Sequence, residues 1–367
     1  MATHIPTFVE RDPATIMAES KAELEILLGR TLQPAQVEQL ILDFIVYRET
    51  LLVNRFNAGM AQMLIQFSKA PILDYLAELV AVTRLPASNA GCIVRFTLVP
   101  GHKAVLIPLG TRVSTSDGVA IFATTADITV SAEVNMVDIM VHAETPGGAA
   151  NGYAPGEVDK ILDPLAFVAT VSNLDTTGGG SDVETDDHFR ERIKLAPSQY
   201  SSAGARSSYE FYAKSASALI TDVSVTSPIP GTVSIVVLTN SEETSQAVIN
   251  QVYAVCNAEN VRPLTDTVLV AAPTRVDYKI EVDIVLYEGA NAATLKAQIL
   301  ADLKTYATEK SKALGQDIIC SHIAQICRKV EVYDVSVKLP VANIEVAEDE
   351  FAECGDIIVN ITGFSRG

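Results

Sequence analysis

A chain of 367 residues is longer than one ordinary compact domain, so two to four domains are expected, each able to bury its own core. With 48% hydrophobic and 20% charged residues, the composition is that of a folded protein and excludes a largely disordered one. The formal net charge of -18 is spread along the chain without a basic cluster, which disfavours a nucleic-acid binder, because such a protein needs Lys and Arg to neutralise phosphates.

The first residues, the apolar runs and the cysteines of the chain bear on the cellular compartment in which it folds. The opening MATHIPTFVERDP lacks the apolar core of a signal peptide, and an uninterrupted apolar run of about 18 residues occurs nowhere, so neither secretion by that route nor a membrane span is expected. An odd number of scattered cysteines favours free thiols in a reducing cytosol over a disulfide framework. We interpret all of them as small core residues: Cys92, Cys256, Cys320, Cys327 and Cys354.

The first 86 residues are predicted to form a rod-like helical module. Asp12-Pro13 is a good helix start, and a helix over 13–28 ends at Gly29 with Ile16, Leu24, Leu27 and Leu28 on one side. From Pro34 to Phe67 apolar residues recur at steps of three and four, which predicts a helix of roughly 50 Å at 1.5 Å per residue. A third helix follows Pro71, with Leu73, Leu76, Leu79 and Val80 inward, and stops before Pro86.

The apolar stripe of the long helix is too extended for the two shorter helices to cover. An intramolecular bundle is the plain interpretation, and partner helices are the hypothesis for the remainder of the stripe. The residues expected to enter such a helical bundle are Val37, Leu40, Ile41, Phe44, Leu51, Leu52, Phe56 and Met63.

After Pro86 the pattern changes to β-branched runs separated by Gly, Pro, Asp and Asn, which predicts an antiparallel β-sandwich or barrel-like domain over 87–180. From 181 onward strands and helices alternate twice, which predicts two α/β domains over 181–273 and 274–367. The predicted fold class is therefore α+β multidomain: an N-terminal helical module, a middle antiparallel β domain and C-terminal tandem α/β layers. The last domain carries an acidic tail with one short strand over 357–361, and a solvated face is favoured over a dock for a basic partner.

Three clusters contain residue types that occur in phosphate, calcium or zinc sites. Gly178, Gly179 and Gly180 lack the Lys of a phosphate loop, so a hinge or tight turn is expected there. Asp182, Glu184, Asp186 and Asp187 lack the glycine and distant Glu of a calcium loop and fit a helix start instead. Cys320, His322 and Cys327 have no fourth zinc ligand, and core packing is favoured.

No catalytic, metal or cofactor site is predicted. The sequence contains no Gly-x-Ser-x-Gly elbow, and no Cys and His have the spacing of a nucleophile site. A carbohydrate enzyme usually needs aromatic platforms, and the chain has no Trp. The expectation is a protein that is not an enzyme and binds no cofactor.

The stretch SDVETDDHFRERIKLAPSQYSSAGARSSYEFYAKSA, residues 181–216, is interpreted as a joint. On a helix over 186–195 the polar face can pair with neighbours, while Phe189 and Ile193 point inward. Ser201 to Gly204 then form a small-residue turn that lets the next helix pack closely. The residues assigned to this joint are Arg190, Arg192, Gly204 and Tyr209.

Several segments in a fixed order resemble the baseplate J family, the wedge proteins of contractile phage tails. They are the helical opening YRETLLVNRFNAGMAQMLIQFSKAPILDYLAELVAVTRLPAS, then GGGSDVETDDHFRERI, ITDVSVTSPIPGTVSIVVL, VRPLTDTVLVAAP and ALGQDIICSHI. They cover about 7–87 and 178–340. The stretch 88–177, with VLIPLGTRVST and GGAANGYAPGEV, resembles the β domain that longer members of the family carry.

The resemblance implies a structural baseplate wedge subunit, repeated in each wedge around a central hub and spike. The implied partners are other copies of the chain, other wedge proteins, the sheath-initiating protein and the central hub and spike, with no nucleic acid and no membrane insertion. The implied location is the virion, in the tail baseplate, after assembly in the bacterial host cytoplasm. The alternatives are the equivalent subunit of a phage-derived particle, such as a tail-like bacteriocin or injection system, and, from another class, a tail-associated hydrolase or receptor-binding protein.

Overall fold

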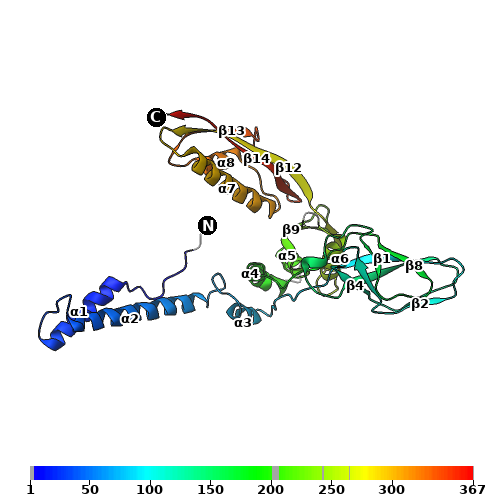
Figure 1. Cartoon of the computed structure of the whole chain (residues 1–367), viewed down its shortest axis with the longest axis horizontal. Coiled ribbons are helices and arrows are strands. Elements are labelled where there is room, and N and C mark those ends of the chain that lie inside the picture. Colours follow the sequence, from blue (N-terminus) through cyan, green and yellow to red (C-terminus); the bar gives the residue numbers. More distant parts are fainter. Residues whose placement is uncertain (1–3, 201–205, 242–243, 264, 367) are drawn as a thin grey trace. The chain divides into compact units, whose positions relative to one another are not determined.

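The computed structural model describes residues 4–200, 206–241, 244–263 and 265–366. The chain divides into two compact units, one of Met1–Arg84 with Phe189–Ile193 and the other of Leu85–His188 with Lys194–Gly367. Helices lead the sequence and sheets follow (Figure 1), which confirms the predicted α+β multidomain class. The predicted domain limits at 86, 180 and 273 stay predictions.

Helix α1 spans Pro13–Leu28, as predicted, because both of its ends are capped by local chemistry. A carboxylate oxygen of Asp12 accepts the free amides of Ala14 at 2.7 Å and Thr15 at 3.1 Å. Gly29 takes the left-handed conformation at φ +63°, which a glycine adopts without strain, and it ends the helix.

Helix α2 spans Val37–Ala61 and runs beside α1 (Figure 1). The core of this pair consists of Ile16, Leu32, Leu42 and Val46. The predicted helix from Pro34 to Phe67 was too long: 25 residues at 1.5 Å each give roughly 37 Å. The chain leaves the helix after Ala61, where the Gln62 side chain bonds the backbone of Phe67 and Lys69 in a turn. Helix α3, Ile72–Glu78, then completes the helical part.

The middle of the chain is an antiparallel β domain that is close to a closed barrel. Its six-stranded sheet has the order β7-β3-β4-β6-β1-β8, and the end strands β7 and β8 contact each other. A short pair, β2-β5, adds to it. The bounds are Gly91–Leu98 (β1), Val105–Ile107 (β2), Arg112–Thr115 (β3), Ile121–Thr124 (β4), Ile128–Val130 (β5), Met136–Ala143 (β6), Val158–Ile161 (β7) and Val168–Asn173 (β8), with a 3-10 turn at Gly148–Ala150.

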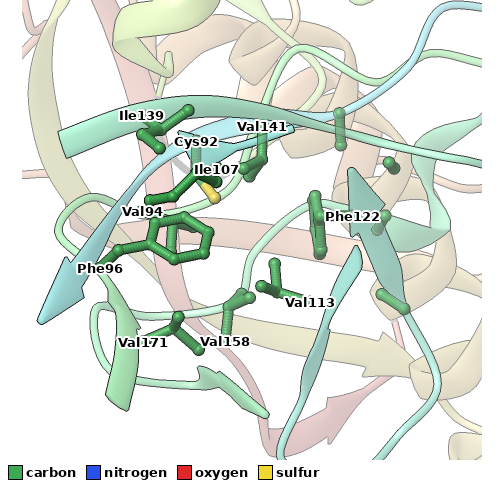
Figure 2. Close-up of a cluster of buried hydrophobic side chains, with 14 of the residues drawn as sticks. Cys92, Val94, Phe96, Ile107, Val113, Phe122, Ile139, Val141, Val158 and Val171 are labelled. Carbon is green, nitrogen blue, oxygen red and sulfur yellow. The ribbon is translucent and has the colours of Figure 1, made fainter. Parts of the chain in front are cut away.

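Strands β1 and β6 alternate buried and accessible residues, so one face of each of these two strands fills the interior. Figure 2 shows side chains from β1, β3, β4, β6, β7 and β8 converging there, with Phe96 and Phe122 among the largest. Cys92 lies in the same cluster, and burial raises the pKa of its thiol to about 12. This cysteine is a core residue, as the sequence predicted.

Asn173 closes the barrel with a buried polar contact that the sequence did not reveal. At the end of β8, its side-chain oxygen accepts the amides of Gly156 and Val158, both at 2.9 Å. Its side-chain nitrogen donates to the carbonyls of Ala154 at 3.0 Å and Asp175 at 2.7 Å. One side chain thus satisfies backbone groups at the place where β7 and β8 approach, and such groups are costly to bury alone.

The next part forms a three-stranded sheet of order β11-β10-β9, with β10 antiparallel to β9 and parallel to β11. Ser245 caps α6, the helix that crosses between the two parallel strands, through the amide of Val248. The bounds are Asp186–Leu195 (α4), Ala196–Tyr200 (a 3-10 helix), Arg206–Lys214 (α5), Ile220–Thr226 (β9), Thr232–Thr239 (β10), Gln246–Cys256 (α6) and Thr267–Ala271 (β11).

The last part is a second three-stranded sheet, of order β13-β12-β14, with two helices on one face (Figure 1). Alternate residues of β12, from Tyr278 to Leu286, pack with Leu295, Ile299 and Leu303 of α7. The bounds are Thr274–Tyr287 (β12), Ala292–Ser311 (α7), Cys320–Cys327 (α8), Val332–Leu339 (β13) and Glu350–Ser365 (β14).

The C-terminal end differs from the prediction of an acidic tail with a short strand. Residues 357–361 lie inside a 16-residue strand, β14, and the acidic residues Glu350, Glu353 and Asp356 belong to it. Parallel pairing with β12 supplies backbone hydrogen bonds whatever the side chains are, and Lys279 of β12 bonds Asp356 at 2.6 Å. Tertiary pairing therefore overrode the charge pattern.

We predict that Asn173→Ala destabilises the β domain by roughly 1–3 kcal/mol, because the buried amide of Val158 loses its acceptor. Urea unfolding followed by a probe within residues 91–173 measures the change. The control is Asn135→Ala, whose side chain is exposed, and it should leave the transition in place. Equal stability of both variants would contradict the closing role of Asn173.

Candidate interaction surface

Helix α2 presents a broad apolar face that α1 does not cover. We define the α2 apolar face as the residues that are 51–68% exposed on this helix and that the sequence assigned to a bundle: Val37, Leu40, Ile41, Phe44, Leu52 and Phe56. Ile45 and Tyr47 are also exposed on this helix. Scattered exposed apolar residues are ordinary, but a contiguous set of this size on one helix is typical of an interaction site.

The other two residues of the predicted bundle set lie differently. Leu51 is half-buried, and Met63 is exposed but lies beyond the end of α2. The residues of α2 that are buried with α1 include Leu42 and Val46, which the predicted set did not contain. The helix therefore has two apolar sides, one already covered by α1 and one open.

Some residues that the sequence placed on the apolar sides of α1 and α3 are exposed, among them Leu28, which is 41% exposed. Leu27 at the end of α1 and Leu79 just after α3 are each 82% exposed, beside buried Ile16 and Leu73. Leu27 lies in the last turn of α1, and Leu79 is the residue that caps the C-terminal end of α3. Ile26, 80% exposed, extends the open apolar surface of α1 and was not among the residues that the sequence pattern indicated.

The predicted joint contains two arginines that bind backbone carbonyl groups. Arg190 of α4 donates through Nε to the carbonyl of Ile65 at 2.8 Å and through Nη2 to that of Ser68 at 2.9 Å. Arg192, 4% exposed, donates through Nη1 to the carbonyl of Thr83 at 3.3 Å. These carbonyls belong to the turn after α2 and to the segment after α3, so α4 fixes both ends of the α3 region.

Phe189 and Ile193 of α4 are fully buried, in agreement with their expected inward direction. The guanidinium of Arg84 lies 4.6 Å from the centre of the Phe189 ring, a cation–π distance, and its Nε also donates to Asp74 of α3 at 2.7 Å. Residues 189–193 thereby belong to the same compact unit as the N-terminal helices, about a hundred residues earlier in the chain.

The remaining joint residues do not extend this contact. Tyr209 of α5 lies in the core beneath the β9–β11 sheet, and its hydroxyl donates to Asp266 at 3.3 Å. Burial raises the pKa of that hydroxyl to about 12. Gly204 lies outside the described residues. The assignment of these residues to a joint stays a prediction.

The predicted hinge glycines are buried and tightly bonded. Gly178 and Gly91 exchange backbone hydrogen bonds at 2.8 and 3.1 Å, and Asn151 bonds both the amide and the carbonyl of Gly180. A Cβ on Gly180 would lie 2.4 Å from the carbonyl oxygen of Gly147, and Gly179 has a φ of +84°. Close backbone packing therefore explains these glycines without any motion.

The cysteines and acidic clusters carry no visible metal chemistry. Cys92, Cys256 and Cys327 are buried free thiols, and Cys354 is partly buried and packs against the C-terminal core. Cys320 is partly buried and does not belong to that core, so the expectation of core packing was wrong for Cys320. In the described ranges, no three His, Cys, Asp or Glu side chains gather closely enough to hold a metal ion. Glu184 instead accepts the amide of Leu85 at 2.8 Å and contacts His188 at 2.6 Å.

Among the residues that the structure describes, no helix combines the length and the apolar character that crossing a bilayer requires.

Comparison with known proteins finds three models of the same family, which match successive parts of this chain. A model described as the Baseplate J-like protein barrel domain matches residues 93–180, the Baseplate J-like central domain matches 201–272, and the Baseplate J-like protein C-terminal domain matches 278–360. Together these three models cover more than half of the chain.

Baseplate protein J of Escherichia phage P2 is 32% identical over 185 residues, which make up 50% of this chain and 61% of that protein. The match thus spans about three fifths of the relative. A chain in the cryo-EM structure of the anti-feeding prophage baseplate aligns over 93% of this chain and 90% of its own length, with 11% identity and a TM-score of 0.41. That likeness is too low to add support. The three successive domain matches confirm the resemblance seen in the sequence: this chain belongs to the baseplate J family.

Proposed function

We propose that this chain is a structural wedge subunit in the baseplate of a contractile phage tail. Membership of the baseplate J family and similarity to the phage P2 protein named baseplate protein J support this role. The observation that carries the mechanical part of the proposal is the α2 apolar face, because an open apolar surface on a folded helix gains free energy when a partner covers it, about 25 cal/mol per Å².

In this proposal the two parts of the chain make different contacts. The α2 apolar face joins helices of other wedge proteins in a bundle, and the α/β half pairs with another copy to link wedges into a ring around the central hub and spike. The sheath-initiating protein is a further partner. These contacts hold the baseplate before attachment and rearrange when the sheath contracts.

Helix α4 is the proposed joint between the N-terminal helices and the α/β half. Arg190 and Arg192 bind carbonyl groups with charge-assisted hydrogen bonds, which are stronger than neutral ones. The same helix leads directly into the 3-10 helix Ala196–Tyr200 and the α/β half. A displacement of the N-terminal helices would therefore pull on α4.

The proposed role is not enzymatic. In this proposal the chain is assembled into the baseplate in the host cytoplasm and remains in the tail of the virion. A zymogram and a cell-binding assay with the purified chain test the hydrolase and receptor-binding alternatives. Genes for a capsid and a terminase beside this one would separate a phage from a phage-derived particle.

We predict that replacing Phe44 and Leu52 together by Asp abolishes incorporation into the baseplate while the isolated chain stays folded. Both side chains are at least 60% exposed, so the substitutions remove a binding surface and leave the α1–α2 core intact. Incorporation is measured by detecting the chain in purified tails, and folding by circular dichroism.

The matched control is Leu109→Asp, which introduces the same charge at a 61% exposed leucine in the β domain. It should be incorporated like the natural chain. Tails that contain the Phe44/Leu52 variant at normal levels would show that the α2 apolar face is not the contact.

A pivot at Gly178–Gly180 stays a prediction, and motion there would first have to break the bonds to Gly91 and Asn151. We predict that Gly180→Ala destabilises the β domain by about 1–3 kcal/mol or more, because its Cβ meets backbone atoms of Gly147 and Ala90. Urea unfolding measures this. Gly148→Ala, with no atom nearer than 3.9 Å, is the control.

If Gly180→Ala is as stable as the control, the close packing does not explain the glycine. If all three glycines can be replaced with normal assembly and normal sheath contraction, the pivot is ruled out.

A further inference from the structure

The backbone at the end of the β domain lies directly against α6, the helix of the β9–β11 sheet. We call this sheet and its helices the central α/β domain. A Cβ on Gly178 would lie 2.8 Å from both the Cβ and the Oγ of Ser245, the residue that caps α6. A Cβ on Gly179 would lie 3.2 Å from the Cβ of Ala247 in the first turn of the helix. The two glycines thus allow two domains to approach at backbone distance.

The contact with α6, and not the backbone conformation, explains why residue 178 is a glycine. The φ of Gly178 lies outside the left-handed region, so an alanine could adopt the same conformation. Within the described part of the chain, and apart from the chain neighbours of Gly178, the Cβ and Oγ of Ser245 are the only atoms within 4 Å of the added Cβ. Gly180 differs, because the nearest obstacles there are backbone atoms of Gly147 and Ala90 inside the β domain.

The glycine segment is firmly held on the β-domain side. Gly178 and Gly91 exchange two backbone hydrogen bonds, and the hydroxyl of Ser88 donates to the carbonyl of Gly179 at 2.9 Å. Residues 178–181 are buried, so breaking these bonds without replacing them would leave buried polar groups without partners. A rotation about this segment is therefore opposed by several backbone hydrogen bonds.

The α6 side of the contact is fixed as well. Val248, Val252 and Cys256 of this helix are buried in the core of the central α/β domain. The Oγ of Ser245 accepts the amide of Val248 and holds the first turn in place. The β domain thus meets the capped end of a helix that is anchored along its length.

The contact lies inside one compact unit and is local. Both domains belong to the unit of residues 85–188 and 194–367, so no boundary of that unit falls between Gly178 and α6. A cavity of about 370 Å³ adjoins the glycines, bordered by Thr177 on one side and Leu219 on the other. Close packing does not continue into that region, so a single substitution at Gly178 can test the contact.

We propose that Gly178 and Gly179 dock the β domain on α6 so that the β domain and the central α/β domain move as one body when the baseplate rearranges. The inference goes beyond the proposed function, because it states which two domains keep a fixed orientation. The α/β half then also sets the position of the β domain in the particle. This docking competes with the pivot that the sequence predicts at the same glycines, since a pivot needs the contact to open.

The first test exchanges size between the two sides of the contact in the full chain. Gly178→Ala should displace α6, and adding Ser245→Gly, which removes both obstructing atoms, should restore the docking. Ser245→Gly alone should change little, because glycine is an acceptable N-cap residue. Spin labels carried by non-canonical residues at exposed Val119 and Ile229 report the distance between the two domains. The distance distribution should be narrow for the natural chain and the double variant, and roughly twofold wider for Gly178→Ala.

Gly148→Ala, whose Cβ meets no atom nearer than 3.9 Å, is the matched control and should keep the narrow distribution with or without Ser245→Gly. If Gly178→Ala does not fold, as judged by circular dichroism, folding of the double variant supports the same contact. The docking is overturned if Gly178→Ala leaves the distribution as narrow as the control does, or if Ser245→Gly does not reverse its effect.

The second test follows the same label pair in purified tails, with labelled chain diluted by unlabelled chain so that only distances within one copy are seen. The distribution should be the same before and after sheath contraction, and a shifted or second distance after contraction would overturn the joint movement. A labelled chain that never enters tails counts against the proposed function instead, and the size exchange in the isolated chain then decides the docking by itself.

Discussion

The structure depends above all on the division of apolar surface on α2. Helix α1 covers one side, where its Ile16 packs with Leu42 and Val46 of α2, and the opposite side, including Phe44 and Leu52, stays in contact with water. Burial of apolar area is the main source of folding and association free energy. Because only one of the two apolar sides of α2 is covered, burial of the other side can still contribute free energy to association. The open side is therefore the strongest reason to expect that this chain works inside an assembly.

A second constraint is that the helical part is not continuous in sequence. Arg190 and Arg192 bind carbonyl groups of Ile65, Ser68 and Thr83, and Phe189 packs beneath Arg84. Without these contacts the turn after α2 and the segment after α3 would lose donors for their carbonyl groups. The β domain is thus inserted between the N-terminal helices and the helix that completes their packing. Family membership alone did not indicate this arrangement, which gives α4 its importance in the proposed function.

Buried polar and small residues stabilise the β domain. The presence of these residues is explained by close contacts between backbone segments and not by a need for flexibility. Asn173 satisfies four backbone groups where β7 meets β8, and Gly180 allows two backbone segments to approach within the space that a Cβ would fill. The edge of β14 shows the reverse situation, because its uncharged centre leaves backbone groups available on the outer side. The chain thus combines a closed β domain, whose strand edges are paired, with an unpaired strand edge that is available for binding another chain.

The sequence by itself determined the elements that depend on local chemistry: α1 between Asp12 and Gly29, α4, the α+β class and the apolar residues of α2. These follow from capping, glycine conformation and periodicity, which act over a few residues. Only the tertiary structure decided which side of α2 is covered, that Leu27 and Leu79 are exposed, that the acidic end is a long strand, and that Asn173 closes the barrel. Each of these depends on partners distant in sequence, and no local pattern records where such partners will lie.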